Sequence, residues 1–238
     1  VIDRINATGY GLTFGLHTRI DDRVQSVVDR ITAGNLYVNR NQIGAVVGSQ
    51  PFGGEGLSGT GPKAGGPDYL PKFTTGAAAG VDAAPFEHGA NPDDVQATLD
   101  TARKLAPVLK QTEMPGPTGE LNRLTTLPRA PVLCLGPGSA AVEAQAALVQ
   151  EAGAVPVPLA GTLSAETLGH LSGFGAVLWW GDEDTGRAMR AALATRDGAI
   201  LPLMTGRAPA SAFHLERHLC VDTTASGGNA ALLAAVGE

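Results

Sequence analysis

The chain has 238 residues, which is enough for one large domain or two small ones. Hydrophobic residues make up 43% of it and charged residues 17%, a balance typical of a well-buried globular protein and not of a disordered one. The net charge of −6 and the shortage of lysine make nucleic acid and anionic membrane surfaces poor partners on charge grounds. No apolar run reaches the length of a transmembrane helix.

Residues 1–75 are predicted to form a compact α/β segment. A helix is expected to open at Asp21, because the valines and the isoleucine that follow recur at helical spacing. Gly34 is expected to end this helix as a left-handed cap, and a short strand should follow at 36–39. A further strand, interrupted by a proline, is expected at 69–75.

Residues 76–91 are rich in glycine, alanine and proline and lack periodicity, so they are predicted to be a linker. Asn91 and Pro92 then have the residue types of an N-cap and a first helical position. One apolar face follows them as far as Leu109, which predicts a helix, and a second loop is expected at 114–119.

Beyond Pro131, short apolar strands alternate with helical patterns. The strands are expected at 132–135, 155–159, 176–180 and 199–203, and the helices at 139–152, 165–170 and 185–194. Such alternation predicts an α/β fold with a doubly wound, mostly parallel sheet.

The two cysteines, Cys134 and Cys220, are far apart in sequence and have no neighbour at metal-ligand spacing. One disulfide could join them, but two reduced, buried thiols are expected. His214 and His218 are four residues apart, which would place them on one face of a helix. Their segment has the pattern of a strand instead, so we expect surface or edge histidines and no metal site.

Seven glycines fall within residues 53–66. Glycine at that density lets the backbone pass close to a ligand or to another segment, although a flexible surface loop would have the same composition. A phosphate-binding loop is excluded, because Gly61 is followed by Pro62 and Lys63 by Ala64 where that motif needs other residues.

Several runs of sequence resemble a known family. The letters YGL at 10–12 and PFGG at 51–54 resemble the C-terminal end of the aldehyde dehydrogenase catalytic core. The longer run NQIGAVVGSQPFGG at 41–54 is similar to the glutamate-semialdehyde branch of that superfamily. Its continuation EGLSGTGPKAGGP at 55–67 is similar to the bifunctional proline utilization A flavoenzymes, which join proline dehydrogenase and 1-pyrroline-5-carboxylate dehydrogenase in one chain.

The resemblance implies a substrate site. It assigns Gly44 and Ala45 to a loop that anchors the substrate's carboxylate through backbone N–H groups, which can bind an anion without a buried cation. It assigns Phe52 to the aromatic residue that packs on the aliphatic part of the substrate. Outside this sequence context, Phe52 would be taken for an ordinary core aromatic.

The resemblance also implies which groups lie elsewhere. In the family the nucleophilic Cys, the general-base Glu and most NAD contacts precede the YGL motif, so they would lie upstream of Val1, where the chain opens without Met or a signal peptide. We therefore expect a fragment, inactive alone, of an NAD-dependent L-glutamate γ-semialdehyde dehydrogenase. Its chemistry would be Cys attack, hydride transfer to NAD and hydrolysis to glutamate, with FAD in the absent proline dehydrogenase part.

The parent polypeptide is expected to be a cytoplasmic homo-oligomer that acts on L-glutamate γ-semialdehyde and does not bind nucleic acid through this segment. Any association with the inner membrane would belong to the rest of the parent. The alternative is a non-catalytic scaffold or lid module that packs on an aldehyde dehydrogenase.

The run GPGSAA at 136–141 is a variant of the dinucleotide-binding fingerprint, placed between a strand and a helix. Pro137 cannot donate an N–H to a pyrophosphate, and the next strand ends without an acidic residue for a ribose. We expect a Rossmann-like domain over 92–213 that does not bind NAD, like the C-terminal accessory domain of longer proline utilization A proteins. A free-standing NAD-binding protein that uses Gly136 and Gly138 is the weaker alternative.

The run CVDTTASGGNA at 220–230 resembles the terminal motif of those longer proteins, which closes over the tunnel between their active sites. Docking for packing alone is the alternative. The predicted organisation is then the end of an aldehyde dehydrogenase core at 1–75, the linker, the accessory domain, and a C-terminal strand and tail at 214–238.

Overall fold

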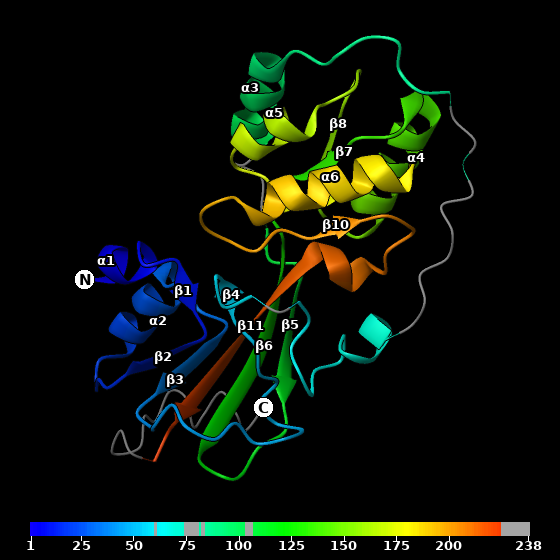
Figure 1. Ribbon diagram of the computed structural model, residues 1–238. Coiled ribbons are helices and arrows are strands. Elements are labelled where there is room, and N and C mark those ends of the chain that lie inside the picture. Colours follow the sequence, from blue (N-terminus) through cyan, green and yellow to red (C-terminus); the bar gives the residue numbers. More distant parts are fainter. Residues whose placement is uncertain (60, 74–80, 82–83, 103–106, 225–238) are drawn as a thin grey trace. The chain divides into compact units, whose positions relative to one another are not determined.

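The structure is a computed structural model that describes residues 1–59, 61–73, 81, 84–102 and 107–224 (Figure 1). Its internal contacts divide the chain into two compact units. The first unit comprises Val1–Leu70, Lys110–Thr126 and the described residues from Glu216 onward, and the second comprises Pro71–Leu109 and Leu127–Leu215.

The second unit is built on a parallel sheet whose strand order is β10-β9-β7-β8 (Figure 1). The strands are β7 (Val132–Cys134), β8 (Pro156–Pro158), β9 (Ala176–Leu178) and β10 (Leu203–Met204). The helices are α3 (Pro92–Ala102), α4 (Gly138–Glu151), α5 (Ala165–His170) and α6 (Glu183–Ala194), and a 3-10 helix, η2 (Ala210–Phe213), follows them. The predicted α/β class with a doubly wound, mostly parallel sheet is confirmed.

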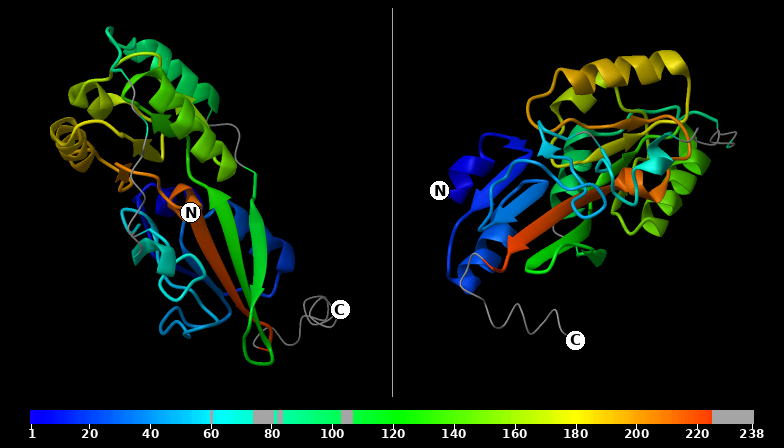
Figure 2. Two further views of the ribbon diagram at one scale, coloured as in Figure 1. Left: turned by 90° about the vertical axis from the view of Figure 1, so that its right-hand side faces the viewer. Right: turned by 90° about the horizontal axis from the view of Figure 1, so that it is seen from below.

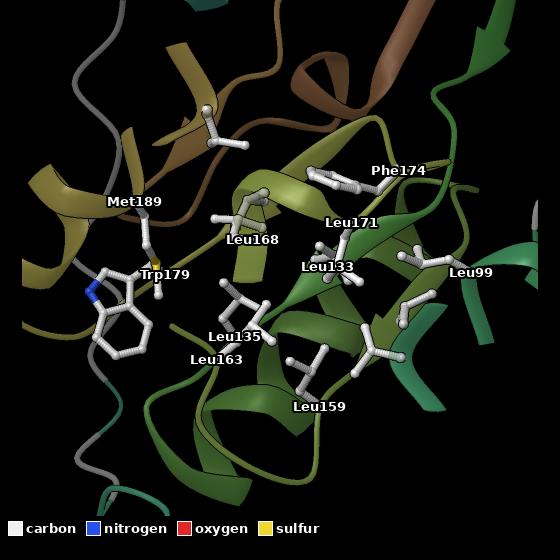
Figure 3. Close-up of a cluster of buried hydrophobic side chains, with 14 residues drawn as sticks. Leu99, Leu133, Leu135, Leu159, Leu163, Leu168, Leu171, Phe174, Trp179 and Met189 are labelled. Carbon is white, nitrogen blue, oxygen red and sulfur yellow. The ribbon is translucent and has the colours of Figure 1, made fainter. Parts of the chain in front are cut away.

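Two apolar clusters cover the two faces of this sheet. Leu133 of β7 belongs to the same cluster as Leu168 of α5, together with residues of α3 and α6 (Figure 3). Cys134, the next residue of β7, belongs to the other cluster with Val142 of α4. Successive residues of a strand point to opposite faces, so helices are needed on both sides of a sheet whose strands are apolar throughout.

Most predicted helices of this unit occur within two residues of their expected ends. α5 spans the predicted 165–170, and α4 begins and ends one residue before the predicted 139–152. The strand predicted at 199–203 is wrong for most of its length, because pairing with β9 begins at Leu203, just after Pro202. Leu109, predicted to be helical, lies in an irregular segment after another proline, and residues 103–106 fall outside the described residues.

The first unit contains a mixed sheet in the order β2-β3-β11-β6-β5. Its strands are β2 (Thr13–Leu16), β3 (Asn35–Val38), β5 (Lys110–Met114), β6 (Glu120–Pro128) and β11 (His214–Asp222). β3 pairs in parallel with strands on both sides, so that Leu36 lies opposite Phe14 of β2 and Leu219 of β11. The unit also includes helices α1 (Ile2–Asn6) and α2 (Asp21–Arg30) and an antiparallel pair of β1 (Tyr10–Gly11) and β4 (Glu55–Gly56).

The hairpin of β5 and β6 was not predicted from the sequence. Lys110 to Met114 pair antiparallel with Thr126 to Asn122, and β6 lies beside β11 (Figure 2). These residues fall inside the domain predicted at 92–213, whereas the hairpin joins the sheet of the first unit. A strand's partners are set by residues far away in sequence, which local periodicity does not reveal.

The predicted left-handed cap at Gly34 is wrong. α2 ends at Arg30, and Ile31 leaves it in an extended conformation with φ of −78° and ψ of 136°. Gly34 instead allows the backbone of Gly53 and Gly54 to pass close to its own. A Cβ at this position would overlap the carbonyl oxygen of Gly53 and lie 2.8 Å from Gly54 Cα.

The segment around Pro71 and the predicted linker also differ from expectation. The strand predicted at 69–75 is wrong over Leu70–Phe73, which form the 3-10 helix η1, where the fixed φ of proline is tolerated. Within the linker predicted at 76–91, Thr162 N donates to His88 O at 2.9 Å and Ala90 N donates to Thr162 O at 2.8 Å. That part of the segment is therefore tied into the second unit.

Candidate functional site

Residues 41–50, here called the 41–50 loop, follow the carboxyl end of β3 and carry Gly44 and Ala45. Gly44 is exposed and has φ of +76°, in the left-handed region that favours glycine. Among the described residues, neither the N–H of Gly44 nor that of Ala45 donates a hydrogen bond to another protein group. Two adjacent amide donors with no protein acceptor are an arrangement that can bind an anion.

Gln50 closes the far end of the 41–50 loop. Its backbone N–H donates to Val46 O at 2.8 Å, and its side-chain Oε1 accepts from Val46 N at 3.1 Å. Gln50 is only 2% exposed, although Val46 and Val47 in the same loop are exposed. The loop is therefore open at its tip and fixed at its base.

The amide of Gln50 leads to a partly buried polar cluster formed with β6 and β11. Gln50 Nε2 donates to Glu120 Oε1 at 2.8 Å and lies 3.4 Å from Cys220 Sγ. Arg40 Nη1 is 2.6 Å from Glu120 Oε2 and 3.2 Å from Cys220 Sγ. Asn122 Nδ2 donates to Glu120 Oε1 as well, at 2.8 Å. Both carboxylate oxygens of Glu120 are thus occupied.

Phe52 lies on the turn that follows the 41–50 loop. Backbone hydrogen bonds in both directions join it to Ala64, with Phe52 N to Ala64 O at 3.0 Å and Ala64 N to Phe52 O at 2.9 Å. Its side chain is half-buried. The backbone of Phe52 is therefore fixed while its side chain stays partly exposed. Such a ring can form an apolar wall for a ligand.

Asn35 and Lys63 hold this turn in place. Asn35 Nδ2 donates to Pro51 O at 2.9 Å, and Asn35 Oδ1 accepts from Gly53 N at 3.1 Å. Lys63 Nζ donates to Asn35 Oδ1 at 3.0 Å and also to the carbonyl oxygen of Gly53. Because both side chains are buried, loss of either one would leave polar groups without partners away from water.

The charge of Lys63 is only partly balanced inside the first unit. Burial lowers the pKa of Lys63 to about 8, and the charges of Glu216 and Glu55 oppose that shift. Lys63 N donates to Glu216 Oε2 at 2.8 Å, and Glu55 pairs with Arg217 at 2.5 Å and 3.0 Å. The lysine of the glycine-rich run is therefore engaged by protein groups of the first unit.

The prediction of surface or edge histidines is wrong for His218. Both histidines lie on β11, as the strand pattern predicted, but β11 has a strand on each side and His218 is 0% exposed. Burial lowers the pKa of His218 to about 4, and the positive charge of Lys63 acts in the same direction. His214 is half-buried, with Nε2 2.7 Å from Ala152 O.

The two thiols are free and buried, as predicted. Burial raises the pKa of Cys134 to about 12 and that of Cys220 to about 11. Since the thiolate is the nucleophilic form, neither cysteine is suited to attack a substrate at neutral pH. Among the described residues no group of three or more His, Cys, Asp or Glu is placed to hold a metal ion, and no helix has the length and apolarity to cross a bilayer.

The fingerprint-like turn of the second unit is filled by a protein side chain. Gln145 of α4 is fully buried; its Oε1 accepts from Gly136 N at 3.0 Å and its Nε2 donates to Gly136 O at 2.9 Å. The same carbonyl accepts from Trp180 N at 2.9 Å. The backbone N–H and carbonyl of Gly136 are therefore both bonded within the protein.

A hollow of about 310 Å³ lies at the carboxyl ends of β2 and β3. It is lined by His17, Thr18, Arg19 and Asn39. Asn39 has φ of 60°, and its Oδ1 accepts from Thr18 N at 2.9 Å, which joins the two segments just before the 41–50 loop.

Residues 1–77 match the family model described as the aldehyde dehydrogenase family. This part of the chain, with its 41–50 loop and Phe52 turn, is therefore similar to the aldehyde dehydrogenase family, as the resemblance predicted. The chain is 39% identical to the "Bifunctional protein PutA" of Escherichia coli over an alignment of 282 positions, which covers 98% of this chain and 21% of that protein. The chain is thus related, over nearly its whole length, to part of the bifunctional PutA proteins.

Two further similarities agree. The "1-pyrroline-5-carboxylate dehydrogenase" of Bacillus cereus is 52% identical over 65 residues, covering 27% of this chain and 13% of that protein. The structure of proline utilization A (PutA) from Corynebacterium freiburgense has the same fold, with a TM-score of 0.60 at 22% identity over 95% of this chain and 24% of that one. The chain spans about a fifth of the length of the PutA relatives that it matches.

The structure places the predicted site residues on two consecutive segments of the first unit. Gly44 and Ala45 are on the 41–50 loop, and Phe52 is on the turn after it. Sequence reasoning did not find Gln50, Glu120 or the buried pair formed by Asn35 and Lys63. No sequence pattern marks these residues, because an isolated Gln or Glu does not indicate a partner 70 residues away.

Proposed function

We propose that this chain is part of an NAD-dependent L-glutamate γ-semialdehyde (1-pyrroline-5-carboxylate) dehydrogenase within a larger bifunctional polypeptide that converts proline to glutamate. The names of the relatives support this substrate class. The observation that carries the proposal is the pair of N–H groups at Gly44 and Ala45, which have no acceptor among the described residues of the protein.

In this proposal the chain orients the substrate. The two N–H groups bind the substrate's carboxylate by charge-assisted hydrogen bonds, while the ring of Phe52 packs on its aliphatic carbons and keeps water away. Fixing both ends of a flexible aldehyde lowers the entropic cost of placing its carbonyl for attack. The nucleophile, the general base, NAD and the FAD of proline oxidation belong to the rest of the parent polypeptide, so the isolated chain is inactive.

The second unit, in this proposal, is a Rossmann-like accessory domain that does not bind NAD. The occupation of the Gly136 backbone by Gln145 supports this reading. The motif at 220–230 is proposed to help to close a substrate tunnel; beyond residue 224 it lies outside the described residues. Its described part is anchored, because Thr223 donates from both N and Oγ1 to Gly119 O, at 2.8 Å and 2.7 Å.

The kinetic test uses the parent polypeptide and a matched pair of glycines. Gly44 and Gly48 both have positive φ, at +76° and +87°, and a Cβ on either one would meet nothing within 4 Å. Gly44→Ala and Gly48→Ala therefore carry the same local strain, on the order of 1 kcal/mol each. We expect Gly44→Ala to raise KM for glutamate semialdehyde about tenfold and Gly48→Ala to raise it much less.

Ala45→Pro, which removes one N–H outright, is expected to raise the same KM. Equal effects of the two glycine substitutions, together with an unchanged KM in Ala45→Pro, would show that these N–H groups do not bind the substrate.

The second candidate is a non-catalytic scaffold or lid for a separate aldehyde dehydrogenase. Both thiols of this chain are buried and protonated, and this observation favours a scaffold and a fragment equally. The intact mass of the native polypeptide separates the two: a mass several times that of 238 residues supports the fragment, and a mass near that of this chain supports the scaffold.

A further inference from the structure

A continuous chain of polar contacts runs from the 41–50 loop to the β5–β6 hairpin. It starts at Val46 N, passes through both ends of the Gln50 amide at 3.1 Å and 2.8 Å, and reaches Glu120 Oε1. It ends at Arg40, whose Nη1 is 2.6 Å from Glu120 Oε2. Because the oxygen and the nitrogen of the amide are both used, the side chain of Gln50 cannot rotate without losing contacts at both ends.

We propose that Gln50 and Glu120 are positioning residues that fix the 41–50 loop in the conformation that binds the substrate's carboxylate. This inference rests on the proposed function of Gly44 and Ala45. Glu120 comes from a hairpin that is 70 residues further along the chain. The hairpin would thereby take part in substrate selection without touching the substrate.

The tip of the loop explains why such support is needed. Two glycines with positive φ and the exposed side chains of Ile43 and Val47 contribute little packing of their own. An anion site made of backbone N–H groups gains affinity only if those groups are already aligned, since ordering a loop on binding costs free energy. Gln50 is the side chain that reaches from this loop into the interior.

Arg40 balances the negative charge of Glu120. A lone carboxylate beneath a loop that binds an anion would oppose binding. The guanidinium of Arg40 compensates Glu120 at close range, and the two side chains are 18% and 15% exposed, so solvent screens their attraction only partly. The amide of Gln50 holds the loop at Val46 N in a fixed position relative to Glu120, and it adds no charge.

The test compares two substrates in the parent polypeptide. Gln50→Met keeps the volume and removes both amide functions, and Glu120→Gln keeps the shape and removes the charge. Steady-state kinetics are measured with glutamate semialdehyde and with hexanal, which lacks the carboxylate. Gln111→Met and Glu113→Gln make the same chemical changes at exposed positions of β5 and are the controls.

We expect Gln50→Met to raise KM for glutamate semialdehyde about tenfold and Glu120→Gln to raise it severalfold. In both variants KM for hexanal should stay within about twofold of that of the unchanged protein. In the two control variants KM for both aldehydes should stay within the same range. The double variant should be no worse than Gln50→Met alone, because both residues act through one chain of contacts. A merely structural role would raise KM for both aldehydes alike.

The proposal is overturned if KM for glutamate semialdehyde stays unchanged, if both substrates are affected equally, or if the two substitutions act additively. Gly44→Ala, measured alongside, separates the two levels of inference. If Gly44→Ala raises KM and Gln50→Met does not, the positioning role fails while the proposed function stands; if neither has an effect, the carboxylate-binding loop itself is the wrong assignment.

Discussion

Two sets of charged side chains, one buried and one partly buried, have defined partners in the first unit. Lys63 is tied to Asn35 and the Gly53 carbonyl, and Glu120 to Arg40 and Gln50. A buried ion pair often contributes little net stability, because desolvation offsets the attraction. Their value here is geometric, since they hold the loop and the turn that carry the candidate site.

His218 should make the first unit sensitive to acid. Its pKa is about 4 in the folded protein and 6.5 in an unfolded chain, so the unfolded chain binds more protons between these values. Stability contributed by the neutral ring is therefore complete above pH 6.5 and is lost as pH falls toward 4, by at most about 3 kcal/mol. Urea unfolding followed by circular dichroism at pH 7 and pH 4.5 measures this loss.

The matched variant is His218→Gln, which keeps a polar side chain that does not titrate. Its unfolding free energy should fall less between pH 7 and pH 4.5 than that of the unchanged protein. An identical fall in both proteins would show that His218 is not the group responsible.

At the scale of elements, the contact between the start of β3 and the Pro51–Gly53 turn leaves no room for a side chain. Gly34→Ala would place a methyl group against Gly53 O and 2.8 Å from Lys63 Nζ, so we expect destabilisation of about 1 to 3 kcal/mol. Gly169→Ala in α5 is the control, because its Cβ would meet nothing within 4 Å. There we expect stabilisation of about 0.5 to 1 kcal/mol.

Urea unfolding of both variants measures these opposite signs. If Gly34→Ala were as stable as the unchanged protein, the close approach of the two segments would not exist in solution.

The sequence predicted helices better than it predicted the sheet of the first unit. α2, α4, α5 and α6 were found because their apolar residues repeat every three or four positions, a signal contained within each helix. The β5–β6 hairpin and the central place of β11 were missed because both depend on partners far away in sequence. The burial of His218 was missed for the same reason.

The candidate site shows the same division. Gly44, Ala45 and Phe52 could be predicted as site residues because their motif is continuous in sequence and resembles a family. Gln50 and Glu120 gain their meaning only when β6 and β11 are brought beside the loop, so no local pattern could assign them.

At the scale of the whole molecule, the proposed function gives the two units different roles. The first carries the proposed substrate-binding residues, and the second has the sheet of a nucleotide-binding fold with its turn closed by Gln145. Titration calorimetry of this chain with NAD should show no saturable heat, because the Gly136 N–H and carbonyl are already bonded. Saturable binding that is lost in Gly138→Trp would instead establish a working dinucleotide site in the second unit.

The parallel pairing of β3 with β11 has a consequence for the newly made chain. Asn35 lies opposite His218, so 183 further residues must be added before the second edge of β3 can be covered. At a synthesis rate of about 5 to 20 residues per second, that edge of β3 stays unpaired for roughly 10 to 40 s after β3 leaves the ribosome. During that interval an apolar strand offers unpaired backbone groups to any neighbouring chain, so this step of biosynthesis is where a holding chaperone would have most effect.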